Sequence, residues 1–136
     1  MASQRKRIAV VDDEWDLAQL FSDGLAMEGF KAYPFDNPEV AVEYIRSNAS
    51  HISLVITDWK MPKLDGFQLT RIVNEIDNEI KVMLISAFDL DIQGLKEIIK
   101  NEYLQKPMHI ANLIEAVKRE LNPITNSNAD ETKLTQ

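Results

Sequence analysis

Residues 8–13 read Ile-Ala-Val-Val-Asp-Asp, an apolar run of four residues that ends on two carboxylates. Three further short runs in the chain also end on a polar group of the kind that handles phosphate. They are residues 54–57 before Asp58, residues 82–85 before Ser86, and residues 103–105 before Lys106 and Pro107. In an open parallel sheet, ligands bind at the carboxyl ends of the strands. The four endings therefore predict a single site at one edge of a sheet.

Composition bounds the class of protein. With 136 residues, 45% hydrophobic and 27% charged, the chain has the size and composition of one globular domain. Its formal net charge of −7 argues against unaided binding to nucleic acid or to an anionic membrane. The absence of cysteine excludes disulfides and thiolate metal sites. No apolar run approaches the roughly 18 residues of a membrane span, and no signal peptide precedes the first strand, so we expect a cytoplasmic protein.

Strand-like and helix-like segments alternate along the chain, which is typical of a parallel sheet with helices packed on it. A polar second strand at residues 31–35 contains Pro34, which favours an edge position because proline cannot donate to a strand ladder. Gly29 is expected to end the first helix. Asn37-Pro38-Glu39 has the residue types of a helix start: a capping Asn, a first-position Pro and an acid in the first turn.

Helical spacing of apolar residues predicts five helices that face a core. The residues expected on those faces are Leu17, Leu20, Phe21, Gly24 and Leu25; Val42, Tyr44 and Ile45; Phe67, Leu69, Ile72, Val73 and Ile76; Leu95, Ile98 and Ile99; and Ile110, Leu113, Ile114, Val117 and Leu121.

Five strands and five helices in alternation predict an α/β fold, a three-layer α/β/α sandwich. Five strands of this length favour the flavodoxin-like sheet order 2-1-3-4-5 over the six-stranded dinucleotide-binding order. The turn after the first strand, Asp12-Asp13-Glu14, would repel a pyrophosphate, which argues against a nucleotide fold. The domain is expected over residues 1–121, and the polar residues 122–136 are expected to form a disordered tail or the stub of a linker.

Asp12, Asp13 and Asp58 would meet at adjacent strand ends. Two like charges about 4 Å apart repel by roughly 4 kcal/mol at an effective dielectric near 20, so three carboxylates need a cation. Hard oxygen ligands favour Mg²⁺, with Mn²⁺ as the alternative. Lys106 would help to neutralise an incoming phosphoryl group, and Ser86 would donate its hydroxyl to it. Asp58, alone after the most buried strand, is the expected nucleophile for an aspartyl phosphate.

Each of these residues alone has an ordinary structural explanation. An Asp after a strand is usually a turn former or a helix cap, and a Ser there is about as often a cap. A single Lys is most often a solvated charge, and Asp65-Gly66 alone is a turn. If these separate explanations were all correct, the residues would fall at strand ends only by coincidence. Taken together, they therefore favour a shared site.

Taken together, the motifs resemble the receiver domain of two-component response regulators, over roughly residues 7–121. They are Val10-Val11-Asp12-Asp13-Glu14, Asp58-Trp59-Lys60-Met61-Pro62 with Asp65-Gly66, Ile85-Ser86-Ala87, and Lys106-Pro107. The resemblance implies that Asp58 accepts a phosphoryl group with the help of Lys106 and Ser86. It implies that Asp12, Asp13, Asp58 and the main-chain carbonyl of Lys60 hold Mg²⁺, and that Ser86 and Tyr103 form a switch pair.

The resemblance also implies partners. The phosphodonor would be a sensor histidine kinase or a histidine phosphotransfer protein, and an unidentified downstream protein would receive the signal. Phosphorylation would shift the surface of the fourth helix, fifth strand and fifth helix between two states. The domain would be a monomer or a phosphorylation-dependent dimer. It would bind neither nucleic acid nor membrane, and would catalyse only its own phosphorylation and dephosphorylation.

One segment departs from the family pattern, and two other functions compete. Receivers commonly have a small-residue stretch with Gly before the fifth strand, whereas residues 98–103 read Ile-Ile-Lys-Asn-Glu-Tyr. A receiver-like interaction module that is not phosphorylated is the first alternative, and the complete set of acids argues against it. A phosphohydrolase of the haloacid dehalogenase type is the second, but it needs an acid two residues after the nucleophile, where Lys60 stands.

Overall fold

A computed structural model describes residues 5–86, 103–105 and 110–121 of the chain. Its parallel strands lie side by side in the order β2-β1-β3-β4-β5, which confirms the predicted flavodoxin-like order. The strands are β1 (Arg7–Val11), β2 (Lys31–Phe35), β3 (Ile52–Asp58), β4 (Lys81–Ser86) and β5 (Tyr103–Gln105). The helices are α1 (Trp15–Met27), α2 (Pro38–Ser47), α3 (Gly66–Ile76) and α5 (Ile110–Leu121), with a short 3₁₀ helix, η1 (Ala49–His51). The predicted fourth helix and the predicted tail lie outside the described residues.

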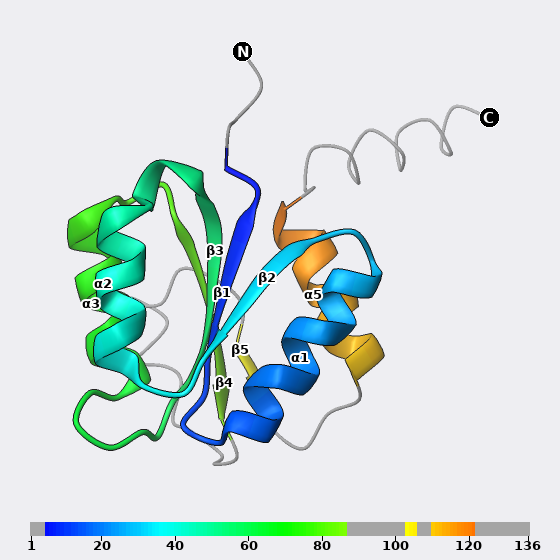
Figure 1. Ribbon diagram of the computed structural model, residues 1–136, viewed down its shortest axis with the longest axis horizontal. Helices are drawn as coiled ribbons and strands as arrows, with labels where there is room; N and C mark the ends of the chain where they lie inside the picture. The colour runs from blue at the N-terminus through cyan, green and yellow to red at the C-terminus, as the bar shows by residue number, and fades with distance from the viewer. Residues whose placement is uncertain (1–4, 87–102, 106–109, 122–136) are drawn as a thin grey trace.

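The sheet is the middle of three layers. Helices α1 and α5 cover one face, and α2 and α3 cover the other (Figure 1). Alternate residues of β1, β3 and β4 supply two separate apolar clusters, as the period of two in a strand requires. The first cluster contains Ile8, Val10, Leu54, Ile56, Met83 and Ile85 beneath α1 and α5, and the second contains Ala9, Val11, Val55 and Val82 beneath α2 and α3.

Strands β1 and β3 form the centre of the sheet. Both are buried on their two faces, with residues 8–11 and 54–56 at most 1% exposed. Among the strands that the structure describes, β2 pairs only with β1 and is an edge of the sheet, which confirms the position inferred from Pro34. Proline is tolerated there because its missing N–H costs no ladder bond at a free edge.

The helix signals were largely correct. Asn37 caps α2 by accepting from the N–H groups of Glu39 at 2.9 Å and Val40 at 3.4 Å. Gly29 follows the end of α1 with φ 95°, a left-handed conformation that favours glycine.

One prediction for α1 is wrong. Leu20 shares the helical spacing of the core residues, yet its side chain is 53% exposed. The buried face of α1 consists of Ala18, Phe21, Ser22 and Leu25, and Leu20 lies to one side of it.

No helix in the part of the chain that the structure describes is long and apolar enough to cross a membrane.

Arg5 ties together three segments at the amino end of the sheet. Its guanidinium donates to the carbonyl oxygens of Ala49 at 2.9 Å and Ile52 at 3.2 Å, and to the Asp77 carboxylate at 2.6 Å. Asp77 also accepts from the N–H of Glu79 at 3.0 Å. The hydrogen bond from Arg5, and then that from Glu79, hold the pKa of Asp77 below its ordinary value of 3.8.

Asp77→Asn is predicted to lower the free energy of unfolding by about 1 kcal/mol at neutral pH, because the charge-assisted bond to Arg5 becomes a neutral one. The folded-state pKa of Asp77 lies below the unfolded-state value. The wild-type advantage is therefore fully present above the unfolded-state pKa of 3.8 and declines as the pH falls through the folded-state pKa. Urea unfolding of both proteins across this pH range measures the difference. A difference that stays constant or grows on acidification would contradict this assignment.

Candidate functional site

Three carboxylates meet at the carboxyl edge of the sheet, at the lower end of the strands in Figure 1. Val11 of β1 lies opposite Thr57 of β3, so the residues that follow them are brought level. As a result, Asp12, Asp13 and Asp58 each offer an oxygen, and these oxygens all lie within 4.8 Å of one another. The structure thus brings together the three acids that the sequence placed at strand ends.

The three acids differ in burial. Asp12 is 2% exposed and Asp58 is 8% exposed, while Asp13 is exposed. Asp12 is held in place by its turn: its carboxylate accepts from the N–H of Glu14 at 2.9 Å, and its own N–H donates to the carbonyl of Phe35 at 2.9 Å. The hydrogen bond from the N–H of Glu14 closes the kind of local turn that Asp commonly forms after a strand. Asp12 therefore has the ordinary turn-forming role in addition to its place in the acidic cluster.

Backbone hydrogen bonds hold the loop between Asp58 and α3 against the ends of β3 and β4. The N–H of Trp59 donates to the carbonyl of Ile85 at 2.8 Å, and the N–H of Gly66 donates to the carbonyl of Trp59 at 2.8 Å. A Cβ atom on residue 66 would lie 2.4 Å from the carbonyl oxygen of Asp58, so only glycine allows this approach. The loop therefore returns to the end of β3 and positions α3 directly against it.

Asp65 has a structural role that the sequence analysis missed. Its carboxylate accepts from the N–H of Gln68 at 2.8 Å, and the Gln68 side chain accepts from the N–H of Asp65 at 3.0 Å. This capping box begins α3. The spacing Asp-x-x-Gln before an apolar helix was a visible signal for it. Asp65 is not one of the three clustered acids.

The remaining predicted site residues are placed only in part. Lys60 lies in the loop after β3, two residues beyond Asp58. Ser86 ends β4, next to Ile85, which is opposite Asp58, and Tyr103 begins β5 opposite Leu84. The backbone of Ser86 is thus at the same edge as the acids. Lys106 lies outside the described residues, and the roles of all four remain predictions.

The three carboxylates have the chemistry of a divalent-cation site. Mg²⁺ binds oxygen ligands at about 2.1 Å, so two of its ligands lie at most about 4.2 Å apart. Oxygens within 4.8 Å of one another come into that range through small rotations of the side chains. A cation there would also relieve the repulsion between the three charges.

Comparisons with known proteins agree with this fold. Residues 8–118 match the response regulator receiver domain. The response regulator receiver protein CpdR of Brucella abortus is 30% identical over 121 residues, which cover 85% of this chain and 97% of that protein. Sporulation initiation phosphotransferase F of Bacillus subtilis is 29% identical over 118 residues, covering 85% of this chain and 94% of that protein. A receiver domain protein from Clostridium thermocellum superposes with a TM-score of 0.78 at 29% identity, covering 88% of this chain and 96% of its own.

The fold and the acidic edge define a flavodoxin-like α/β signalling domain. The chain belongs to the response regulator receiver family, whose members act in two-component systems. Receiver domains interact with histidine kinases or phosphotransfer proteins.

Asp13→Asn is predicted to stabilise the protein when divalent cations are absent. Two unit charges 4.8 Å apart interact by about 3 kcal/mol at an effective dielectric of 20. Solvent reduces this for the exposed Asp13, so the expected gain in the free energy of unfolding is about 0.5–1 kcal/mol. Urea unfolding in EDTA measures it. Glu43→Gln, which removes an exposed carboxylate from α2, serves as the control and should change little. Lower stability of Asp13→Asn in EDTA would show that the cluster is not under electrostatic strain.

Proposed function

We propose that this receiver domain accepts a phosphoryl group on Asp58 while Asp12, Asp13, Asp58 and the main-chain carbonyl of Lys60 hold Mg²⁺. The observation that supports this proposal most strongly is the approach of three carboxylates to within 4.8 Å at the carboxyl edge of the sheet. Such a cluster is electrostatically unfavourable and is stabilised by a cation, which would in turn neutralise the charge of an incoming phosphoryl group. Mn²⁺ has the same ligand preference and would substitute for Mg²⁺.

Asp58 is the proposed nucleophile because of its position. It ends β3, which is hydrogen-bonded to a strand on each side, and it retains 8% exposure through which a donor can approach. Asp12 is less accessible and its carboxylate is engaged by the N–H of Glu14. Asp13 is exposed on the turn, which suits a ligand that completes the cation site.

In the proposed transfer, a carboxylate oxygen of Asp58 attacks the phosphorus atom of a phosphohistidine. The phosphorus–nitrogen bond breaks, the imidazole leaves with its electron pair and takes up a proton, and an acyl phosphate forms. When bound, Mg²⁺ supplies charge neutralisation at the phosphoryl oxygens. Lys106 supplies a further positive charge. Water later attacks the phosphorus and releases inorganic phosphate, so that Asp58 is regenerated without another enzyme.

The proposed output follows from strand order. Ser86 lies next to Ile85, which is opposite Asp58, and Ser86 itself pairs with Gln105 of β5. A hydroxyl that moves toward the phosphoryl group would therefore act on β5, where Tyr103 is the second switch residue. The surface of residues 90–100, β5 and α5 would then present a new face to a downstream protein, as a monomer or a phosphorylation-dependent dimer. We place the protein in the cytoplasm, with a histidine kinase or phosphotransfer protein as donor and without direct binding to nucleic acid or membrane.

Phosphorylation is tested with acetyl phosphate and Mg²⁺, followed by intact mass and by tryptophan emission. We expect the wild type to gain one phosphoryl group and Asp58→Asn to gain none. Asp65→Asn is the matched control, because it alters a nearby carboxylate outside the cluster and Asn still caps a helix. Since Trp15 is 45% exposed and also emits, a Trp15→Phe background assigns the emission change to Trp59.

The dependence on the cation is part of the same test. Omission of Mg²⁺ should abolish the gain in mass, and Mn²⁺ should restore it. A wild type that stays unmodified with Mg²⁺ present would favour the alternative of a non-phosphorylated interaction module. Equal modification of Asp58→Asn and the wild type would overturn the assignment of the acceptor.

A further inference from the structure

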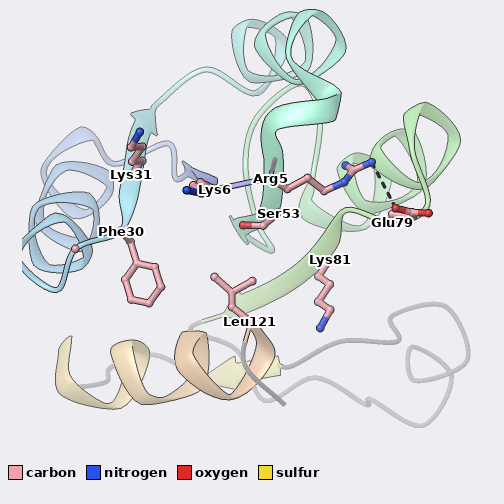
Figure 2. Close-up of a pocket in the computed structure, with 9 residues that line it drawn as sticks. Arg5, Lys6, Phe30, Lys31, Ser53, Glu79, Lys81 and Leu121 are labelled. Atoms are coloured by element: carbon pink, nitrogen blue, oxygen red, sulfur yellow. Dashed lines mark ion pairs between the residues drawn. The ribbon is translucent and has the colours of Figure 1, made fainter. Parts of the chain in front are cut away.

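The three acids are far from the cations that gather at the other end of the sheet. A pocket of about 410 Å³ lies at that end (Figure 2), and its cationic lining residues are Arg5, Lys6, Lys31 and Lys81. Arg5 donates to the carbonyl of Ile52 at the start of β3, whereas Asp58 ends that strand. Seven strand residues span about 20 Å, more than twice the roughly 8 Å Debye length at physiological salt. Ligands that complete a cation site at the acids must therefore come from segments next to Asp58.

The loop that follows β3 is such a segment, and its base is closed around Trp59. The N–H of Trp59 donates to the carbonyl of Ile85, and the carbonyl of Trp59 accepts from the N–H of Gly66, each at 2.8 Å. The indole also contacts the ring of Phe67, with the ring centroids 6.2 Å apart. These contacts fix the chain immediately before Lys60.

Met61 anchors the chain immediately after Lys60. Its side chain is 9% exposed and belongs to the apolar cluster beneath α2 and α3, whereas Lys60 and Pro62 are exposed. Of residues 60–63, all of which the structure describes, only Met61 is buried. Proline restricts the residue before it to extended conformations, so Pro62 also limits the backbone of Met61.

The carbonyl of Lys60 belongs to the peptide unit that joins Lys60 to Met61. This unit is planar, so the direction of the carbonyl follows from the positions of the two flanking Cα atoms and from one rotation about the line between them. The contacts of Trp59 hold the chain before the unit, and burial of Met61 holds its far end. Because the Lys60 side chain is exposed, these neighbours set the direction of its carbonyl.

We propose that Met61 positions the Lys60 carbonyl and thereby makes the cation site selective for Mg²⁺ over larger ions. Mg²⁺ requires near-ideal octahedral geometry with oxygens at about 2.1 Å, whereas Ca²⁺ accepts oxygens at about 2.3–2.6 Å in flexible arrangements. A carbonyl held in one place therefore matters more for Mg²⁺ than for Ca²⁺. Met61 is a positioning residue that acts through Lys60, and the inference rests on the cation site of the proposed function.

Met61→Ala tests the proposal in separate titrations with Mg²⁺ and Ca²⁺, followed by amide chemical shifts of the full chain. We expect this variant to bind Mg²⁺ about tenfold more weakly, a usual loss when a group that supports a metal ligand is removed. Its affinity for Ca²⁺ should fall by less than about threefold. Met61→Leu, which keeps the apolar volume, should bind both ions within about twofold of the wild type.

Val73→Ala separates positioning from a general loss of stability. Val73 lies on α3, is fully buried and belongs to the same apolar cluster as Met61, so its truncation also leaves a cavity there. Urea unfolding should show that both alanine variants are destabilised, yet Val73→Ala should bind Mg²⁺ as the wild type does. Met61→Val keeps part of the apolar contact and should weaken Mg²⁺ binding about threefold, which supplies the measurement if Met61→Ala does not fold.

The proposal is overturned if Met61→Ala binds Mg²⁺ as the wild type does, if it loses affinity for Mg²⁺ and Ca²⁺ equally, or if Val73→Ala loses as much affinity for Mg²⁺. Asp13→Asn removes one of the clustered acids and should weaken binding of both ions, which verifies that the shifts report on the cluster. A wild type that does not respond to Mg²⁺ contradicts the proposed function, and this inference with it. A wild type that binds Mg²⁺, with Met61→Ala unchanged, contradicts only the role of Met61.

Discussion

The register between β1 and β3 is the constraint on which the site depends. Val11 lies opposite Thr57, and the chain places an acid immediately after each of them. A slip of one residue would turn every side chain of β3 to the other face of the sheet. That slip is prevented by burial on both faces, because residues 54–56 are at most 1% exposed and each faces one of the two apolar clusters. The hydrophobic core therefore fixes where Asp58 ends up.

The arrangement brings three negative charges together at an electrostatic cost. Three carboxylates within 4.8 Å repel, and nothing in their own electrostatics favours the meeting. The core and the backbone hold them there, through the bond from Glu14 to Asp12 and the close approach of Gly66 to the end of β3. A fold that keeps like charges in place is prepared for a cation, which relieves the repulsion on binding.

Charges of opposite sign gather at the two ends of the strands. The acids lie at the carboxyl edge, whereas Arg5, Lys6, Lys31 and Lys81 surround a pocket at the amino end. Arg5 shows how such a group serves the fold as well, since it holds Ala49, Ile52 and Asp77 together.

The sequence predicted what depends on local pattern and missed what depends on distant segments. Strand ends, the edge position of Pro34 and the cap at Asn37 are encoded in neighbouring residues, and all three predictions are confirmed. Helical spacing alone could not tell that Leu20 lies beside the buried face of α1 rather than on it. The basic pocket combines residues 5, 6, 29–31, 53, 79, 81 and 121, so no local motif in the sequence predicts it. The boundary of the domain at residue 121 stays a prediction.

The central claim is that packing of the core positions Asp58, rather than Asp12 or Asp13, as the phosphoryl acceptor. Borohydride reduction of the protein after treatment with acetyl phosphate and Mg²⁺ tests this claim directly, because reduction converts an aspartyl phosphate into homoserine. Peptide sequencing by mass spectrometry then identifies the modified position. The account predicts homoserine at position 58 alone. Homoserine in place of Asp12 or Asp13, or at none of the three positions, would contradict it.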